Sequence, residues 1–200
     1  MNSDFNCLPP SPLLEGGGDG GSLRSQSDAE FVLARPGADF NFCPRCAAQL
    51  ATLNLGGLPR RACPQAACGF VHWDNPAPVV AALVERNGKM ILARGQGWPE
   101  KMFGLITGFL ERDETPHQAV AREVKEELDL DARTVTLIGV YPFVRKHEVI
   151  MAFHVEAAGE IRLNEELAEY RLIEPDKLRP WEFGTGLAVR DWLEGMRRKP

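Results

Sequence analysis

The stretch from Thr115 to Leu128 constrains the fold of this chain more than any other part of its sequence. Thr115 is a good helix N-cap, and Pro116 suits the first turn of a helix. Apolar residues then recur at helical spacing, at Ala119, Val120, Val124 and Leu128. We therefore predict a helix over residues 115–128.

Three glutamates share one face of this predicted helix. Glu123 lies three and four residues before Glu126 and Glu127, so the three side chains are neighbours on the helix surface. They repel one another unless a cation lies between them, and Mg2+ prefers such carboxylate ligands together with phosphate oxygens. Arg122 can hold a further carboxylate, such as that of Glu114, in place. Spacing alone leaves a second interpretation open, in which these residues form a solvated acidic face.

The segment around the helix resembles the Nudix box, Gly-x5-Glu-x7-Arg-Glu-(apolar)-x-Glu-Glu-x-Gly-(apolar). The residues that match in register are Gly108, Glu114, Arg122, Glu123, Val124, Glu126, Glu127 and Leu130. Asp129 stands where the family usually has Gly. This position ends the helix and prefers a left-handed backbone, which Asp tolerates better than most residues.

The resemblance implies an α+β fold, the Nudix α/β/α sandwich, and a metal-dependent hydrolase. Such an enzyme cleaves the pyrophosphate bond of a nucleoside-diphosphate-linked compound, such as ADP-ribose, NADH or FAD, to two monophosphates. The implied cofactor is Mg2+ or Mn2+, held by Glu123, Glu126 and Glu127, which polarises the diphosphate and activates water. Arg122 and Glu114 complete the implied catalytic set. The alternative is a non-catalytic, nucleotide-sensing Nudix domain, and the intact glutamates favour the enzyme.

Two cysteine pairs precede this segment, Cys43-Pro-Arg-Cys46 and Cys63-Pro-Gln-Ala-Ala-Cys68. Four thiolates in such pairs can surround Zn2+ tetrahedrally, although disulfides are an alternative. A site with four thiolates has no open position for water, so its role would be structural. A zinc ribbon directly before a Nudix domain resembles the NADH pyrophosphatase branch of the family. In the alternative of a nucleotide-sensing domain, the ribbon would dock a partner.

The chain divides into three predicted parts. Residues 1–40 are rich in Pro, Gly and Ser and are expected to form a flexible tail that carries Cys7. The zinc ribbon is expected over 41–75 and the Nudix domain over 76–200. Strands are predicted at 79–84, 90–93, 103–106, 135–143, 149–155 and 170–173, with a turn at Asn87-Gly88 and a closing helix over 184–196.

Substrate-binding residues are predicted from the sequence around Tyr141-Pro142-Phe143. This is the centre of a longer motif in NADH pyrophosphatases, Ser-Gln-Pro-Trp-Pro-Phe-Pro-x-Ser, whose other residues are missing here, so ADP-ribose and FAD rival NADH. Tyr141 and Phe143 can stack on a base, with core packing an equal alternative for Phe143. Arg145 can meet phosphate charge, and Phe103 can line the pocket.

Further carboxylates are candidates for metal binding or for a general base. Glu169 lies in Glu-Tyr-Arg-Leu172, which resembles the family's Glu-x-x-Trp segment, and the resemblance implies an additional metal ligand there. Glu148, Glu165 and Glu166 are candidates for a general base that the sequence does not rank.

Composition limits the partners of the chain. The net charge is −5, and the Lys and Arg residues are scattered, so no nucleic acid is expected as a partner. A hydrolase that acts on nucleotide caps of RNA is a further alternative, against which the charge argues weakly and which a local basic patch would favour. No apolar run reaches the ~18 residues of a membrane span, and the N-terminus lacks the pattern of a secretory signal. We expect a cytoplasmic protein with a small-molecule nucleotide substrate, and a homodimer is possible in this family.

Overall fold

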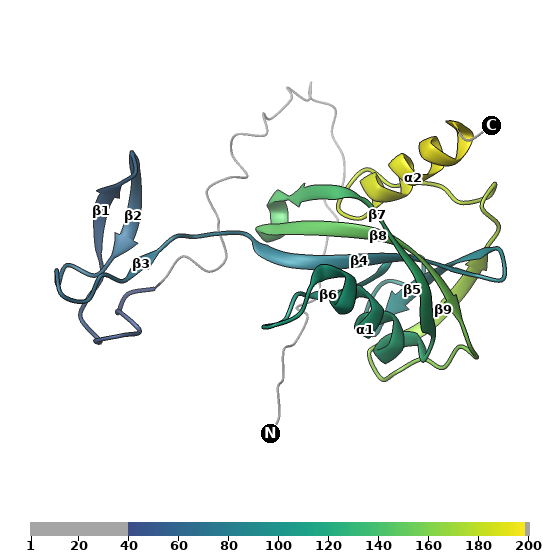
Figure 1. Ribbon diagram of the computed structural model, residues 1–200, viewed down its shortest axis with the longest axis horizontal. Coiled ribbons are helices and arrows are strands. Elements are labelled where there is room, and N and C mark those ends of the chain that lie inside the picture. The colour runs from purple at the N-terminus through teal and green to yellow at the C-terminus, as the bar shows by residue number, and fades with distance from the viewer. Residues whose placement is uncertain (1–39, 199–200) are drawn as a thin grey trace, which may run out of the picture. The chain divides into compact units, whose positions relative to one another are not determined.

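The computed structural model describes residues 40–198 (Figure 1). The predicted tail, with Cys7, therefore lies outside the described residues except for Phe40. The described chain forms two compact units. One contains residues 40–76 and 145–147, and the other contains residues 77–144 and 148–198.

The smaller unit contains a three-stranded antiparallel sheet made of β1 (Ala51–Leu55), β2 (Leu58–Ala62) and β3 (Val71–His72). Gly56 and Gly57 join β1 to β2 and both have positive φ angles, 63° and 79°, which a tight hairpin turn requires. Buried Cys43, Leu50 and Cys63 form a small core beside this sheet.

The larger unit is built on a six-stranded mixed sheet, in which five strands have the order β7-β8-β4-β5-β9 and the sixth, β6, pairs with β4. Its strands are β4 (Ala77–Arg86), β5 (Lys89–Gly95), β6 (Ile106–Phe109), β7 (Asp131–Phe143), β8 (Glu148–Ala158) and β9 (Leu167–Ile173). The central strand β4 pairs in parallel with β8 and antiparallel with β5 and β6. The predicted turn between β4 and β5 is confirmed, because Asn87 and Gly88 both have positive φ angles.

Two helices cover opposite faces of this sheet, α1 (Pro116–Leu128) and α2 (Gly186–Arg198) (Figure 1). The alternation of side chains along β4 supplies both cores. Val80, Ala82 and Val84 pack in one core with residues of α1. Val79, Ala81 and Leu83 pack in the other core with residues of α2. The predicted α/β/α sandwich is confirmed.

One predicted strand is displaced. The strand expected over 103–106 begins only at Ile106, as β6, and Gly104 forms an isolated bridge with Ala93. The pairing of β6 with β4 sets where this strand lies, because Gly108 is opposite Val80 in the register of the two strands. The short 3-10 helix η2 (Val144–Lys146) follows β7. None of the helices within residues 40–198 is long and apolar enough to cross a membrane.

Candidate active site and metal-binding sites

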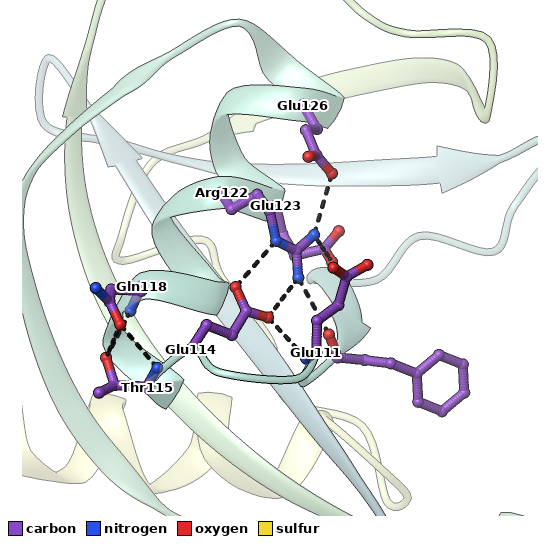
Figure 2. Close-up of polar contacts among 8 residues, drawn as sticks. Glu111, Glu114, Thr115, Gln118, Arg122, Glu123 and Glu126 are labelled. Atoms are coloured by element: carbon purple, nitrogen blue, oxygen red, sulfur yellow. Dashed lines mark hydrogen bonds and ion pairs between the residues drawn. The ribbon is translucent and has the colours of Figure 1, made fainter.

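A capping box fixes where α1 begins. The Gln118 backbone N–H donates to Thr115 Oγ1 at 3.3 Å, and the Thr115 N–H donates to Gln118 Oε1 at 2.8 Å (Figure 2). At the other end, Asp129 adopts the left-handed conformation with φ 56° and ψ 26°. Asp129 therefore provides the backbone turn for which the Nudix box usually uses Gly.

Arg122 joins three of the glutamates (Figure 2). Its Nε donates to Glu114 Oε2 at 3.1 Å and its Nη2 to Glu114 Oε1 at 2.8 Å, a bidentate contact. Its Nη1 donates to Glu123 Oε1 at 2.7 Å and to Glu126 Oε2 at 3.1 Å. The bond to Glu114 is the main reason that the pKa of the Arg122 guanidinium is raised, so Arg122 stays charged.

Glu114 also fixes the loop before the helix. The Glu111 N–H donates to Glu114 Oε1 at 2.7 Å, and Arg122 Nη2 donates to the Phe109 carbonyl at 3.2 Å. The bond from Arg122, followed by the one from the Glu111 N–H, lowers the pKa of Glu114. An ionised Glu114 therefore holds Arg122 and the loop 109–114 together.

Gly108 makes room for the Glu123 carboxylate. A Cβ atom at position 108 would lie 1.8 Å from Glu123 Oε1. No side chain other than hydrogen leaves Glu123 in this place. The requirement is one of space, since the carboxylate lies directly over the β6 backbone at Gly108.

Glu127 is a buried carboxylate, with only 6% of its surface exposed. Its pKa is raised to about 8, mainly by burial and then by the negative charges of Glu123, Glu166 and Glu126, in that order. Burial also raises the pKa of Glu123, against the effect of Arg122. Every charged group that shifts Glu127 is another carboxylate, so a divalent cation is the partner that this cluster fits.

Glu166 joins this cluster from a distant part of the sequence. The Arg162 N–H donates to the Leu128 carbonyl at 2.9 Å, and the Asn164 N–H donates to the Glu127 carbonyl at 3.2 Å. Asn164 Oδ1 then accepts from the Glu166 N–H at 3.0 Å. These bonds place residues 162–166 along the C-terminal end of α1, close enough for Glu166 to raise the pKa of Glu127.

The four cysteines of the smaller unit lie close together as free thiols. Their sulfur atoms are all within 4.8 Å of one another, with Sγ–Sγ distances of 3.6 Å for Cys43 and Cys68 and 3.5 Å for Cys46 and Cys63. Tetrahedral ligands at the Zn–S bond length of about 2.3 Å would be about 3.8 Å apart. The donor set and its spacing therefore fit Zn2+.

The Cys43 thiol is prepared for ionisation. Burial would raise its pKa, but the backbone N–H groups of Arg45 and Cys46 and the neighbouring thiols lower it to about 7. Among the described residues, the four cysteines are the one group of His, Cys, Asp or Glu side chains already close enough to hold a metal. Glu123 and Glu126 are bonded to Arg122 instead.

Comparison with known proteins decides the family, because residues 75–191 match the NUDIX domain. This chain belongs to the Nudix family. Its relatives include the "NAD-capped RNA hydrolase NudC" of Mycobacterium bovis, 32% identical over 135 residues, which are 66% of this chain and 42% of that protein. The protein of the same name from Vibrio vulnificus is 31% identical over 155 residues, 76% of this chain and 58% of the relative. The chain thus spans about half the length of these relatives.

Solved structures agree with this assignment. The crystal structure of a NUDIX hydrolase from Nitrosomonas europaea matches with a TM-score of 0.66 and 26% identity, covering 80% of this chain and 92% of that one. A MutT protein from Methanosarcina mazei shares the fold, with a TM-score of 0.51, 20% identity, and 64% and 100% coverage. The family of the chain and the fold of its Nudix domain are therefore established.

The structure places the aromatic residues predicted to bind substrate in separate surroundings. Tyr141 is buried in the α2-side core, where its hydroxyl donates to Asp191 Oδ2 at 2.8 Å. Burial, followed by this bond, raises the pKa of Tyr141. Phe143 packs at the edge of the same core. Phe103 lies elsewhere, with the Arg171 guanidinium 3.9 Å from its ring centroid, and Arg145 lies in η2.

Glu169 is placed among arginines. Its carboxylate lies 3.6 Å from Arg94 Nη2 and 3.6 Å from Arg171 Nη2. Glu166, and not Glu169, is among the groups that raise the pKa of Glu127. The metal-binding role implied for Glu169 stays a prediction.

Sequence reasoning missed Phe109 as a site residue. Its side chain is 59% exposed, and its carbonyl is bound to Arg122 at the glutamate cluster. Its position in the sequence could have indicated this contact, because Phe109 directly follows the first Gly of the box.

Proposed function

We propose that this chain is a metal-dependent Nudix pyrophosphohydrolase that cleaves the diphosphate of a nucleoside-diphosphate-linked compound into two monophosphates. The observation that carries this proposal is the buried Glu127, whose charged neighbours are Glu123, Glu126 and Glu166. Such a group of carboxylates is stable in ionised form only with a cation, and it fits a site where a metal and a diphosphate meet.

Glu123, Glu126 and Glu127 would hold Mg2+ or Mn2+, and Glu166 would add a fourth carboxylate from the loop beside α1. When bound, the metal polarises the diphosphate and lowers the pKa of the attacking water. Arg122 and Glu114 keep the glutamates and the loop 109–114 in fixed relative positions through the bonds described above. Glu127 gives up its proton when the metal binds, since a carboxylate must be ionised to act as a ligand.

We propose a dinucleotide of the NAD type as the first substrate class, free or at the 5′ end of RNA. The support comes from the relatives, which are named for the hydrolysis of NAD-capped RNA. The negative net charge had argued against nucleic acid, but these relatives make RNA a candidate.

We further propose that residues 41–75 form a zinc ribbon, with structural Zn2+ bound by Cys43, Cys46, Cys63 and Cys68, and that residues 76–200 form the Nudix domain. The sulfur distances and the low pKa of Cys43 support the zinc site. With four thiolate ligands the zinc would have no position for water, so its contribution would be to folding.

A substrate panel tests the proposed activity. Purified protein with Mg2+ or Mn2+ is given NAD, NADH, ADP-ribose, FAD and an NAD-capped RNA oligonucleotide, and the products are separated by chromatography. We expect cleavage at the diphosphate, for example of NAD to AMP and nicotinamide mononucleotide, and no turnover by Glu127→Gln. Absence of turnover of every compound by folded, zinc-loaded protein would favour the nucleotide-sensing alternative.

A further inference from the structure

The smaller unit contains a cavity that the proposed hydrolysis does not use. Its volume is about 480 Å³, and it is bounded by residues 58–61 of β2, by His72 of β3 and by residues 73–75, which follow β3. The side chains that give it chemical character are Arg60, Arg61, His72 and Trp73. A cavity of this size is large enough for one nucleotide.

Arg60 is held at this cavity but its hydrogen-bonding capacity is not fully used. Its Nη1 donates to the Trp73 carbonyl at 2.7 Å, which fixes the guanidinium. Its Nε is buried and has no hydrogen-bond partner among the described residues. The guanidinium held in this way keeps its positive charge at the cavity lining, where it can meet an anionic ligand.

Arg61 adds a second positive charge to the lining. It is anchored by a bond from its Nη2 to the Phe40 carbonyl at 3.2 Å, and it lies opposite His72 in the register of β2 and β3. The lining also contains one carboxylate, Asp74, whose Oδ1 lies 3.3 Å from His147 Nε2. The two arginines therefore outnumber the acidic group, which has a partner of its own.

Trp73 provides an aromatic surface at the same place. Its side chain is 52% exposed, although the Arg60 guanidinium lies 4.8 Å from the centroid of its ring. An exposed indole beside arginines is the combination that binds single-stranded nucleic acid, since the ring stacks on a base and the cations meet the backbone phosphates.

We propose that this cavity binds one nucleotide of a single-stranded RNA, with the base on Trp73 and the phosphate at Arg60 and Arg61. The inference rests on the proposed function, because it takes RNA that carries a dinucleotide at its 5′ end as the substrate. It assigns the ribbon a role in binding the RNA strand, in addition to the structural role of the zinc.

Binding of a short oligoadenylate that has a 5′ hydroxyl and a fluorescent 3′ label tests the proposal. This probe contains no diphosphate, so binding is measured by anisotropy without hydrolysis. We expect Trp73→Leu to weaken binding about tenfold, and Trp73→Phe to recover most of the affinity because a ring remains. We expect Arg60→Gln to weaken binding and to reduce the dependence of affinity on salt concentration, since one ion contact is lost.

Two substitutions in the same unit serve as matched controls. Phe42 is a 64% exposed aromatic residue and Arg45 is an exposed arginine, and neither lines the cavity, so Phe42→Leu and Arg45→Gln should bind like the wild type. Zinc content and thermal unfolding of each variant show that the ribbon is intact. If Arg60→Gln loses zinc, Arg61→Gln takes its place.

Equal affinity of the wild type and zinc-loaded Trp73→Leu for the oligonucleotide would overturn the proposal. Competition by AMP that is as strong as that of unlabelled oligonucleotide would also overturn it, since the cavity would then take a free nucleotide and not a strand. Failure of the proposed function would show separately, as wild-type protein that binds the oligonucleotide but does not hydrolyse NAD.

Discussion

At the scale of single residues, the surroundings of Glu127 change the pH at which it ionises. Its pKa in the folded protein is about 8, well above the ordinary value of 4.5. The folded state therefore binds a proton near neutral pH that the unfolded chain has lost. The contribution of Glu127 to stability is fully present below about pH 4.5 and is lost as the pH rises to about 8.

The direction of this pKa shift predicts how the stability of the metal-free protein changes with pH. Without Mg2+ or Mn2+, the wild type should lose stability relative to Glu127→Gln as the pH rises from about 5 to about 8, by a few kcal/mol. Urea unfolding of both proteins at several pH values measures the difference. Added Mg2+ should restore stability to the wild type at high pH and leave the variant unchanged. If the free energies of unfolding of the two proteins changed with pH in the same way, Glu127 would not be a buried, proton-binding group.

A second prediction at this scale concerns the different effects of substituting Glu166 and its neighbour Glu165. Glu166→Gln should lower the affinity for Mg2+ or the turnover of NAD by about 10–100-fold, because it removes a carboxylate from the cluster. Glu165→Gln is the matched control, since Glu165 is exposed and is not among the groups that shift the pKa of Glu123 or Glu127. Steady-state kinetics at varied Mg2+ concentration gives both quantities. Equal effects of the two substitutions would remove Glu166 from the site.

At the scale of secondary-structure elements, the caps of α1 were the most predictable part of the fold. Thr115, Pro116 and Asp129 are local signals, and the helix begins and ends where they stand. The position of β6 was not predictable in the same way, since an apolar run does not say which of its residues pair with another strand. Gly108 shows the difference, because its place in β6 depends on Val80, far away in the sequence.

The packing of Glu123 against β6 leads to a third prediction. Gly108→Ala should reduce NAD hydrolysis at least tenfold, because the new Cβ atom displaces the Glu123 carboxylate. The midpoint of thermal unfolding should change by only about 2–4 °C, since the clash is relieved by movement of a flexible side chain. Gly195→Ala, on α2 with nothing within 4 Å of the added atom, is the control and should keep full activity. Full activity of Gly108→Ala would mean that Glu123 functions from another position.

Strand β7 shows why the surroundings of Tyr141 could not be predicted from the sequence. The pairing of β7 with β8 shifts register between Leu137 and Gly139, and such an irregularity changes which side chains face which side of the sheet. Tyr141 follows the shift and points into the α2-side core. Gly139 permits this arrangement, because a Cβ there would lie 2.6 Å from the Tyr141 hydroxyl oxygen.

At the scale of the whole molecule, the candidate site is assembled from segments that local patterns do not connect. The box residues were predictable from a resemblance to the Nudix pattern, and the four cysteines from their spacing. Glu166 was one of several carboxylates that the sequence did not rank, since it reaches the cluster only through backbone bonds to the end of α1. Sequence patterns thus predict the metal-binding groups better than the residues that tertiary structure brings to them.

The division into two units predicts different effects of losing each metal. Cys46→Ser should abolish bound zinc and lower the thermal stability of the ribbon, because three thiolates hold the metal poorly. NAD hydrolysis should fall only indirectly, since the glutamate cluster lies in the other unit. Metal analysis of the purified variant and kinetics at low temperature test both statements. Stoichiometric zinc in Cys46→Ser would contradict the four-cysteine site.

The parallel pairing of β4 with β8 also sets an order of events during synthesis. β4 lies at the centre of the sheet, but its partner β8 begins at Glu148, so the nascent chain cannot complete the sheet until that segment has left the ribosome. The cysteine ligands are only 25 positions apart, between Cys43 and Cys68, and emerge much earlier. We therefore expect the ribbon to take up zinc while the strands of the Nudix domain are still unpaired, so that zinc supply acts on the chain before its Nudix domain has folded.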